Sequence, residues 1–175
     1  KGWNIENSKK SYKEEVKNVD DFLLPISYRP FDTRYTFYHK SLIWGMSQPT
    51  MRNFLNHDNL GLILCRQVNN NFGHAFITTK LVESSFISNK TKEINSVFPL
   101  YIKNETSGSN LFIGSNEQRR PNFSPELIKT FSVRIGLDFV SEGRGDLNKT
   151  FGPESVLYYA YAIFHSPNYR LRYAE

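Results

Sequence analysis

Alternating apolar and polar positions predict β-strands in the first two-thirds of the chain. Residues 34–39 are rich in aromatic and β-branched side chains, which favour extended backbone. Residues 60–68 place leucines on one face and Ile63 with Cys65 on the other. Apolar side chains on both faces are typical of a central strand that is covered on two sides.

A β-hairpin is predicted between residues 60 and 81. The asparagine-rich segment 69–73 ends in glycine, and both residue types tolerate the backbone of a tight turn. Residues 74–81 then alternate cleanly, so we expect two antiparallel strands joined by this turn. The open face of the hairpin is expected to carry His74, Thr78 and Lys80.

A further strand is predicted over residues 94–102, where apolar positions alternate again. Pro99 lies inside this segment, and proline cannot donate a hydrogen bond to a neighbouring strand. We therefore expect the strand to lie at the edge of a sheet or to carry a bulge.

Helical spacing replaces strand alternation in the last third of the chain. Ser124 as N-cap, Pro125 in the first turn and Gly136 as terminator predict a helix over residues 124–136. Residues 153–165 repeat apolar side chains at helical spacing, and Pro167 can open another helix. Strands followed by helices predict an α+β fold, with a twisted, mainly antiparallel sheet packed against C-terminal helices.

The first 24 residues are polar and charged, and we interpret them as a connector that docks on neighbouring protein. Residues 25–175 then form the main domain. Ser11 followed by Glu14 resembles a capping box, so a short helix is predicted over residues 11–17. The chain begins without methionine or a signal peptide pattern, and we expect it to be a fragment of a longer protein.

Composition and charge narrow the possible functions only partly. A chain of 175 residues fits one domain with a docking segment, and no apolar run is long enough to span a membrane. Lys and Arg exceed Asp and Glu by 22 to 17, and the net charge of +5 favours approach to a polyanion. Cys65 is the single cysteine, which excludes an internal disulfide and predicts a reducing compartment, the cytoplasm.

Several kinds of catalytic or cofactor site are missing from the sequence. It contains no phosphate-binding glycine loop, no dinucleotide-binding glycine motif and no clustered His and Cys residues that would hold zinc. Cys65 lies in an apolar strand, where a buried hydrophobe is expected rather than a nucleophile. We therefore expect no catalytic residue, no metal and no cofactor in this chain.

Cationic and amide side chains at predicted strand ends and loops are the remaining functional candidates. Cations bind DNA phosphates, while guanidinium and amide groups read the edges of bases. The alternative is that these side chains only form ion pairs or solvated surface. The candidates are Arg34, Arg52, Arg66, Gln67, Lys80, Lys90, Lys92, Arg119 and Arg120.

Several sequence blocks resemble one known family. Residues 28–38, YRPFDTRYTFY, resemble the RPFDxRxxYY block that follows the methyltransferase core of type ISP restriction–modification enzymes. Residues 159–170, YAYAIFHSPNYR, are similar to the YIYAVLHSPxYR ending of that family. Between them, in the family's order, lie Met51-Arg52, NLGLILCRQ at 59–67, FPLY at 98–101, PNFSPE at 121–126, GDL at 145–147 and FGPE at 151–154.

The resemblance implies a C-terminal target recognition domain, shared with related adenine-specific DNA methyltransferases. Such enzymes join a nuclease, an ATP-driven motor, an adenine-N6 methyltransferase and this domain in one polypeptide. The domain would recognise double-stranded DNA and hold it for methylation and restriction. S-adenosylmethionine, ATP and Mg would bind the methyltransferase and motor parts of the same polypeptide, whose motifs are absent here, so this chain alone is expected to be catalytically silent.

Individual DNA contacts are predicted from the hairpin and not from the family. Arg66, Gln67, His74 and Lys80 are the first candidates, and Arg34, Arg52 and Lys92 are expected to contact phosphates. The RPFD block at 29–32 is interpreted as structural, with Asp32 holding Arg29 or Arg34. One alternative function is a docking module between methyltransferase and motor with little base readout; another is an independent enzyme, which the missing motifs disfavour.

Overall fold

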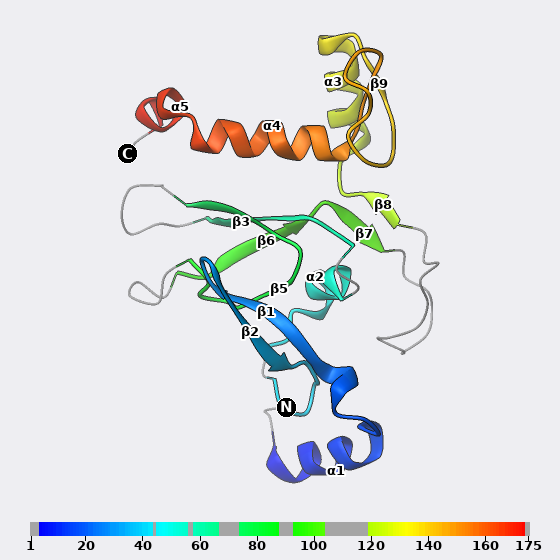
Figure 1. The fold of residues 1–175 in the computed structure, drawn as a ribbon, viewed down its shortest axis with the longest axis vertical. Coiled ribbons are helices and arrows are strands. Elements are labelled where there is room, and N and C mark those ends of the chain that lie inside the picture. Colours follow the sequence, from blue (N-terminus) through cyan, green and yellow to red (C-terminus); the bar gives the residue numbers. More distant parts are fainter. Residues whose placement is uncertain are drawn as a thin grey trace.

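Small, mainly antiparallel sheets fill the first two-thirds of the chain and helices dominate the last third, which confirms the predicted α+β class (Figure 1). The computed structural model describes residues 4–43, 45–55, 58–66, 74–87, 93–103 and 119–173. The strands are β1 (Leu23–Arg29), β2 (Asp32–Phe37), β3 (Gly61–Cys65), β4 (Ala75–Thr78), β5 (Leu81–Val82), β6 (Asn95–Pro99), β7 (Tyr101–Lys103), β8 (Arg119–Pro121), β9 (Asp138–Phe139) and β10 (Thr150–Phe151). The helices are α1 (Ile5–Glu15), α2 (Gln48–Met51), α3 (Pro125–Ile135), α4 (Pro153–His165) and α5 (Pro167–Arg172), with 3₁₀ turns η1 (Asp20–Phe22) and η2 (Arg52–Phe54).

Strand β3 is the centre of a three-stranded sheet in the order β4-β3-β6, as its two apolar faces predicted. Ile63 is fully buried on one face, in a cluster that includes Phe54 and Val82. Leu62 faces the other way and packs against a cluster that contains Leu157 of α4. The hairpin of β3 and β4 is confirmed by the antiparallel register from Gly61–Thr78 to Leu64–Ala75.

Strand β6 is an edge strand, and Pro99 is its last residue. The predicted single strand over residues 94–102 is therefore two strands, because Leu100 turns the chain out of β6 and into β7. The register ends at the pair of Gly61 and Pro99, although the N–H of Leu100 still donates to the carbonyl oxygen of Leu60 at 2.7 Å. The N–H that Pro99 lacks would therefore face away from β3, which an edge strand tolerates.

The second sheet has the order β2-β1-β5, with β1 antiparallel to β2 and parallel to β5. It covers the face of the β3–β4 hairpin that was expected to be open. Thr78 is only 6% exposed, and its Oγ1 lies 3.1 Å from Oγ of Ser27 in β1. The expectation of an open face at Thr78 is wrong because this second sheet packs over it.

Helix α1 begins well before the predicted start at Ser11. The side chain of Asn4 accepts hydrogen bonds from the backbone N–H groups of Glu6 and Asn7, so Asn4 is the N-cap. Ser11 lies inside the helix and donates a hydrogen bond to Glu15. The capping-box pattern therefore marked the wrong turn, because an earlier polar residue satisfies the first free N–H groups. The connector role of residues 1–24 stays a prediction.

The C-terminal helices begin and end at the residues that the sequence predicts. Ser124 caps α3 by accepting from the N–H of Leu127, and Gly136 ends the helix in the left-handed conformation with φ of 70°. Helix α4 follows Gly152, and Ser166 caps α5. No helix in the described ranges has the length and apolar character that a membrane crossing requires.

The loop between α3 and α4 is held by Asp146. Its carboxylate oxygen Oδ1 accepts from the backbone N–H groups of Lys149, Thr150 and Asn148 at 2.8–2.9 Å. These bonds, with that from Lys149 the strongest contribution, lower the pKa of Asp146 from 3.8 to about 2. The loop is therefore closed by charge-assisted bonds although the carboxylate is exposed.

The bonds to Asp146 predict a specific loss of stability in acid. A folded-state pKa below the unfolded one means that the stabilisation is complete above about pH 3.8 and disappears as the pH falls through about 2. In Asp146→Asn the side chain still offers an amide oxygen but no longer titrates. We expect the stability difference between the wild type and this variant, measured by urea unfolding, to shrink from pH 4 to pH 2. A constant difference over this range would contradict the assigned role.

Candidate nucleic-acid interface

The turn between β1 and β2 presents an aromatic ring to solvent. Phe31 is fully exposed and adopts a φ of 65°, in the left-handed region that bulky residues rarely enter. This conformation costs roughly 1–2 kcal/mol for a residue with a β-carbon. Pro30 precedes it, and the pairing of Arg29 with Asp32 closes the turn on both sides.

The cations of the RPFD block are held in ordered positions beside this turn. The guanidinium carbons of Arg34 and Arg29 lie 3.9 Å and 4.1 Å from the centre of the Tyr28 ring. Arg34 also pairs with Asp32 at 3.0 Å, and Arg29 pairs with Glu83 at 2.6 Å. Of the two arginines that Asp32 was expected to hold, it pairs with Arg34. Arg34 remains largely exposed, so its ion pair leaves room for a second anion.

Lys80 lies next to the same turn, although it is distant in sequence. It sits between β4 and β5, and its Nζ donates to Oγ1 of Thr33 in β2 at 3.1 Å. Thr33 and Arg34 are consecutive residues of β2, so their side chains leave the strand on opposite faces, and Lys80 and Arg34 flank the β1–β2 turn from its two sides. Sequence reasoning selected both residues but had no means of placing them together.

His74 extends this surface from the start of β4. The imidazole is exposed and stacks on Phe76 with 6.2 Å between ring centres. The ring of Phe76 in turn lies 6.4 Å from that of Phe31 in a T-shaped arrangement. We call the region around the β1–β2 turn, which carries Phe31, Arg34, His74 and Lys80, the hairpin-tip surface.

Arg66 lies on the opposite face of the β3–β4 hairpin from His74. The antiparallel pairing of β3 with β4 reaches Leu64 and Ala75, and the next opposed positions are Cys65 and His74. These two side chains share one face of the hairpin, and Arg66 projects from the other. Arg66 is exposed and makes no hydrogen bond or ion pair with any described residue. The structure therefore separates Arg66 from His74, although both belong to the first group of candidates.

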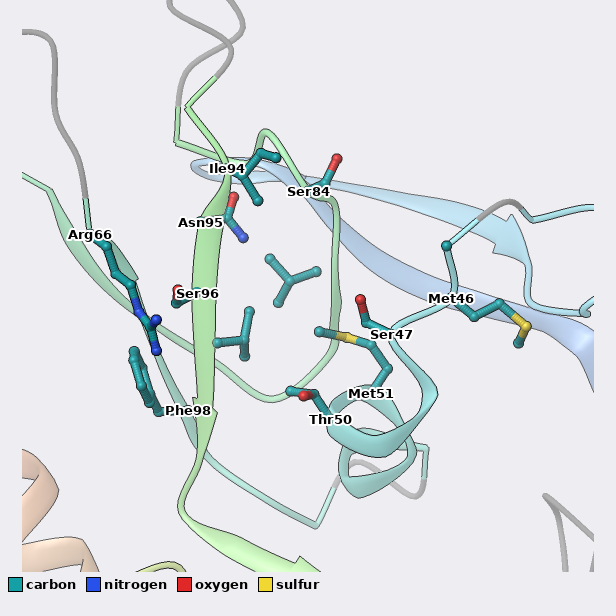
Figure 2. A pocket seen from close by; sticks show the side chains of 13 residues that line it. Met46, Ser47, Thr50, Met51, Arg66, Ser84, Ile94, Asn95, Ser96 and Phe98 are labelled. Carbon is teal, nitrogen blue, oxygen red and sulfur yellow. The ribbon is translucent and has the colours of Figure 1, made fainter. Parts of the chain in front are cut away.

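A hollow of about 350 Å³ lies beside Arg66, along the edge strand β6 (Figure 2). Figure 2 shows the Arg66 side chain next to Phe98 of β6. Asn95 and Ser96 precede Phe98 along β6. Hydroxyl groups from Ser47, Thr50 and Ser84 line the hollow, and Met51 is also part of its wall. Its polar groups can accept hydrogen bonds from a ligand or donate to one, but no charged cluster marks it as a catalytic site.

Other predicted contacts have structural roles or lie outside the described residues. Arg52 is half-buried, and its Nη2 donates to the carbonyl oxygen of Lys103 at 3.3 Å, so it braces β7. Arg119 stacks on Tyr101 and forms a 2.9 Å ion pair with Glu142. Gln67, Lys90 and Lys92 lie outside the described residues.

A basic corner at the end of α4 was missed by sequence reasoning. His165 Nε2 lies 3.0 Å from the carbonyl oxygen of Ala75, which places the junction of α4 and α5 beside the start of β4. Helix α4 packs on the face of the hairpin that carries Leu62, so this junction lies on the side of Arg66, opposite the His74 side chain. Nη2 of Arg170 lies 3.2 Å from Nδ1 of His165, and Arg172, two residues later, is exposed. Figure 1 places α5 at the same end of the molecule as the open ends of β3 and β4. Arg170 and Arg172, which follow the helix-starting Pro167, were the sequence signal that could have identified this corner.

Neither a metal centre nor an activated cysteine is found in the described part of the chain. No group of three His, Cys, Asp or Glu side chains there is arranged to hold a metal ion. Cys65 is buried, as expected, and burial together with the charge of Glu93 raises the pKa of its thiol. A raised pKa disfavours the thiolate and thus a nucleophilic role.

Comparisons with known proteins point in one direction. The family model described as the Type ISP C-terminal specificity domain matches residues 1–175. Two solved structures resemble the fold: a complex of DrdV with DNA determined by cryo-electron microscopy, and the ATP-dependent Type ISP restriction–modification enzyme LlaBIII bound to DNA. No curated protein matches the chain.

The likeness to these two structures extends over almost the whole chain but only a small part of theirs. The DrdV match has a TM-score of 0.63 at 18% identity and covers 97% of this chain and 14% of that one. The LlaBIII match has a TM-score of 0.62 at 17% identity and covers 99% of this chain and 10% of that one. At these identities the likeness establishes the fold.

Proposed function

Because this chain belongs to the Type ISP C-terminal specificity domains, we propose that it recognises double-stranded DNA in a sequence-specific manner. Domains of this family are parts of restriction–modification enzymes, and both solved relatives are DNA complexes. The chain supplies specificity, and chemistry belongs to other parts of a longer polypeptide.

The hairpin-tip surface is the observation that carries this proposal. It combines two exposed or partly exposed cations, Arg34 and Lys80, with an imidazole and an outward-facing aromatic ring. Duplex DNA offers phosphates to the cations and stacked bases to the ring. The basic corner of α5 lies on the other face of the β3–β4 hairpin and adds a second cationic area on the side of Arg66.

In the longer polypeptide, the bound DNA would be positioned for adenine-N6 methylation and for restriction. A recognition domain fixes the register of the duplex, which lets a methyltransferase flip the correct adenine out of the stack. S-adenosylmethionine, ATP and Mg would be bound by the methyltransferase and motor parts, and the residues described here need no cofactor for this role. The enzyme would act in the cytoplasm, where the host DNA lies.

A docking module with little base readout is the second candidate, and the helices favour it. Val133 of α3 and Tyr159 of α4 are 76% and 59% exposed, which leaves apolar surface without cover from the described residues. In such a module, mutations in these helices would weaken its association with the rest of the polypeptide. Mutations in the hairpin-tip surface would leave DNA binding unchanged.

Salt-dependent DNA binding tests the proposal. We expect the chain to bind a random-sequence duplex in fluorescence anisotropy, with log affinity falling by about 0.9 per log unit of salt for each phosphate contact. Lys80→Ala and Arg34→Ala should each weaken binding and reduce the salt slope by about one contact. Arg66→Ala tests the opposite face of the hairpin in the same assay.

Lys129→Ala is the matched control, because Lys129 is an exposed lysine of α3, outside the hairpin-tip surface. It removes the same charge and should leave the salt slope unchanged. Equal losses for Lys80→Ala and Lys129→Ala would mean that only net charge matters. Absence of duplex binding at low salt, in folded protein, would favour the docking module.

A further inference from the structure

We propose that Phe31 is a wedge that inserts its ring between adjacent base pairs of the bound duplex. This inference rests on the proposed DNA-binding function and adds a distortion of the DNA to it. The first argument is conformational: Phe31 is fully exposed and has a φ of 65°. Strained backbone of this kind concentrates at functional sites, and nothing among the described residues covers the ring in compensation.

The backbone that carries the ring is held in a defined conformation. The Phe76 ring lies 6.4 Å away in a T-shaped arrangement, at the outer end of the range for aromatic pairs, and it leaves the Phe31 ring fully exposed. Pro30 fixes the backbone immediately before it, and the β1–β2 ladder runs up to the pair of Arg29 and Asp32. Because the backbone of the turn is already fixed, only the side-chain torsions of Phe31 lose conformational entropy when the ring inserts.

The charges around the ring favour a polyanion as its partner. Asp32 and Glu83 are paired with Arg34 and Arg29, so neither carboxylate faces the partner uncompensated. Lys80 then adds an ammonium group that donates to the hydroxyl of Thr33, a neutral group, and pairs with no carboxylate among the described residues. An aromatic side chain flanked by cations matches a base step flanked by two phosphates, and apolar wedges of this kind unstack and kink DNA in other proteins.

Plasmid relaxation measures the distortion without knowledge of the recognised sequence. Closed circular DNA is relaxed by topoisomerase I in the presence of the chain, and the number of bound molecules is measured in parallel by anisotropy. Separating base pairs reduces the local twist, so we expect the wild type to shift the topoisomer distribution in proportion to the protein bound. Phe31→Asn should lose this shift per bound molecule, and Phe31→Leu, which keeps an apolar wedge, should retain part of it.

Two controls separate the wedge from folding and from general aromatic contacts. Asparagine enters the left-handed region readily, so Phe31→Asn should unfold at or above the wild-type midpoint. Tyr35→Asn removes another exposed aromatic ring of β2 away from the turn, and it should leave the topoisomer shift unchanged.

The possible outcomes distinguish this inference from the proposed function. If Phe31→Asn shifts topoisomers as the wild type does at equal occupancy, or if the wild type binds without a shift, the wedge is overturned and DNA binding stands. If Phe31 instead anchors this chain to another protein segment, duplex binding and topology will both be unaffected by Phe31→Asn, which also overturns the wedge. If the wild type does not bind duplex DNA, the proposed function fails and the wedge fails with it.

Discussion

Replacing Gly145 with alanine is expected to destabilise the protein by about 3 kcal/mol or more, one of the two largest effects that the structure predicts. The left-handed φ of 73° at Gly145 costs a residue with a β-carbon about 1–2 kcal/mol. A β-carbon there would also lie 2.6 Å from the carbonyl oxygen of Thr150 and 2.7 Å from Cα of Phe151. Overpacking of this kind adds about 1–3 kcal/mol, and backbone atoms cannot swing aside as a flexible side chain can.

The loop cannot relax easily because it is bonded at several points around Gly145. The N–H of Gly152 donates to the carbonyl oxygen of Arg144 at 2.9 Å, and that of Leu147 donates to Thr150 at 2.9 Å. Phe151, which would have to move, is buried at 3% exposure between the rings of Phe131 and Phe139. Displacing this backbone would therefore disturb the packing of α3 against the loop.

Gly136→Ala is the matched control for this prediction. Gly136 has nearly the same φ, 70°, but a β-carbon there would meet nothing within 4 Å. It should cost only the conformational penalty of about 1–2 kcal/mol. Urea unfolding followed by circular dichroism measures both variants, and equal losses for Gly145→Ala and Gly136→Ala would show that the close approach at Gly145 is relieved at no cost.

The second large effect is expected for Asn59→Ala, with a loss of about 3 kcal/mol or more. Asn59 is 4% exposed, and its amide makes three hydrogen bonds to backbone groups. Nδ2 donates to the carbonyl oxygens of Asn53 and Tyr101 at 3.0 Å and 2.8 Å, and Oδ1 accepts from the N–H of Tyr101 at 3.1 Å. Truncation leaves buried polar groups without partners, at about 1–3 kcal/mol each when no water replaces the amide.

The loss would spread because Asn59 joins elements that are far apart in sequence. The Asn59 amide connects η2 with β7. A second bond connects the same two elements, because Oδ1 of Asn53 in η2 accepts from the N–H of Lys103 in β7 at 2.9 Å. Tyr101 then accepts from the N–H of Gly143 through its hydroxyl oxygen, which connects the sheet to the loop before α4. The two asparagines thus link the β-rich and helical parts.

Asn122→Ala is a graded control, since the Asn122 amide is exposed and donates one hydrogen bond within the described residues, to the carbonyl oxygen of Pro99 at 2.9 Å. It should cost about 1 kcal/mol. The same urea unfolding measurement ranks the two variants. A loss for Asn59→Ala no greater than that for Asn122→Ala would mean that water enters and satisfies the buried groups.

Features that depend on neighbouring residues in the sequence were predicted well. The limits of α3 follow from Ser124 and Gly136, because capping is decided within one turn of helix. The central position of β3 follows from its two apolar faces, and the edge position of β6 follows from Pro99. The start of α1 was misplaced because two polar residues compete as caps and only the folded chain shows that Asn4 is used.

Features that depend on how the strands assemble were not predictable in the same way. Alternation shows which side chains share a face within one strand, but the register between strands decides which of them meet. Arg66 and His74 were therefore taken as one group, although the pairing of Leu64 with Ala75 sends them to opposite faces. Thr78 was expected in solvent, whereas the packing of β1 over the hairpin buries it.

The sequence by itself determined the α+β class, the limits of α3 and α4, the hairpin of β3 and β4 and, through its motif blocks, the family. Only the tertiary structure placed Lys80 beside Thr33, His74 beside Phe76 and Phe31 at a strained, exposed turn. The physical reason is the range of the interactions involved. Capping and alternation act over a few residues, whereas a recognition surface is made by groups that long-range pairing brings together.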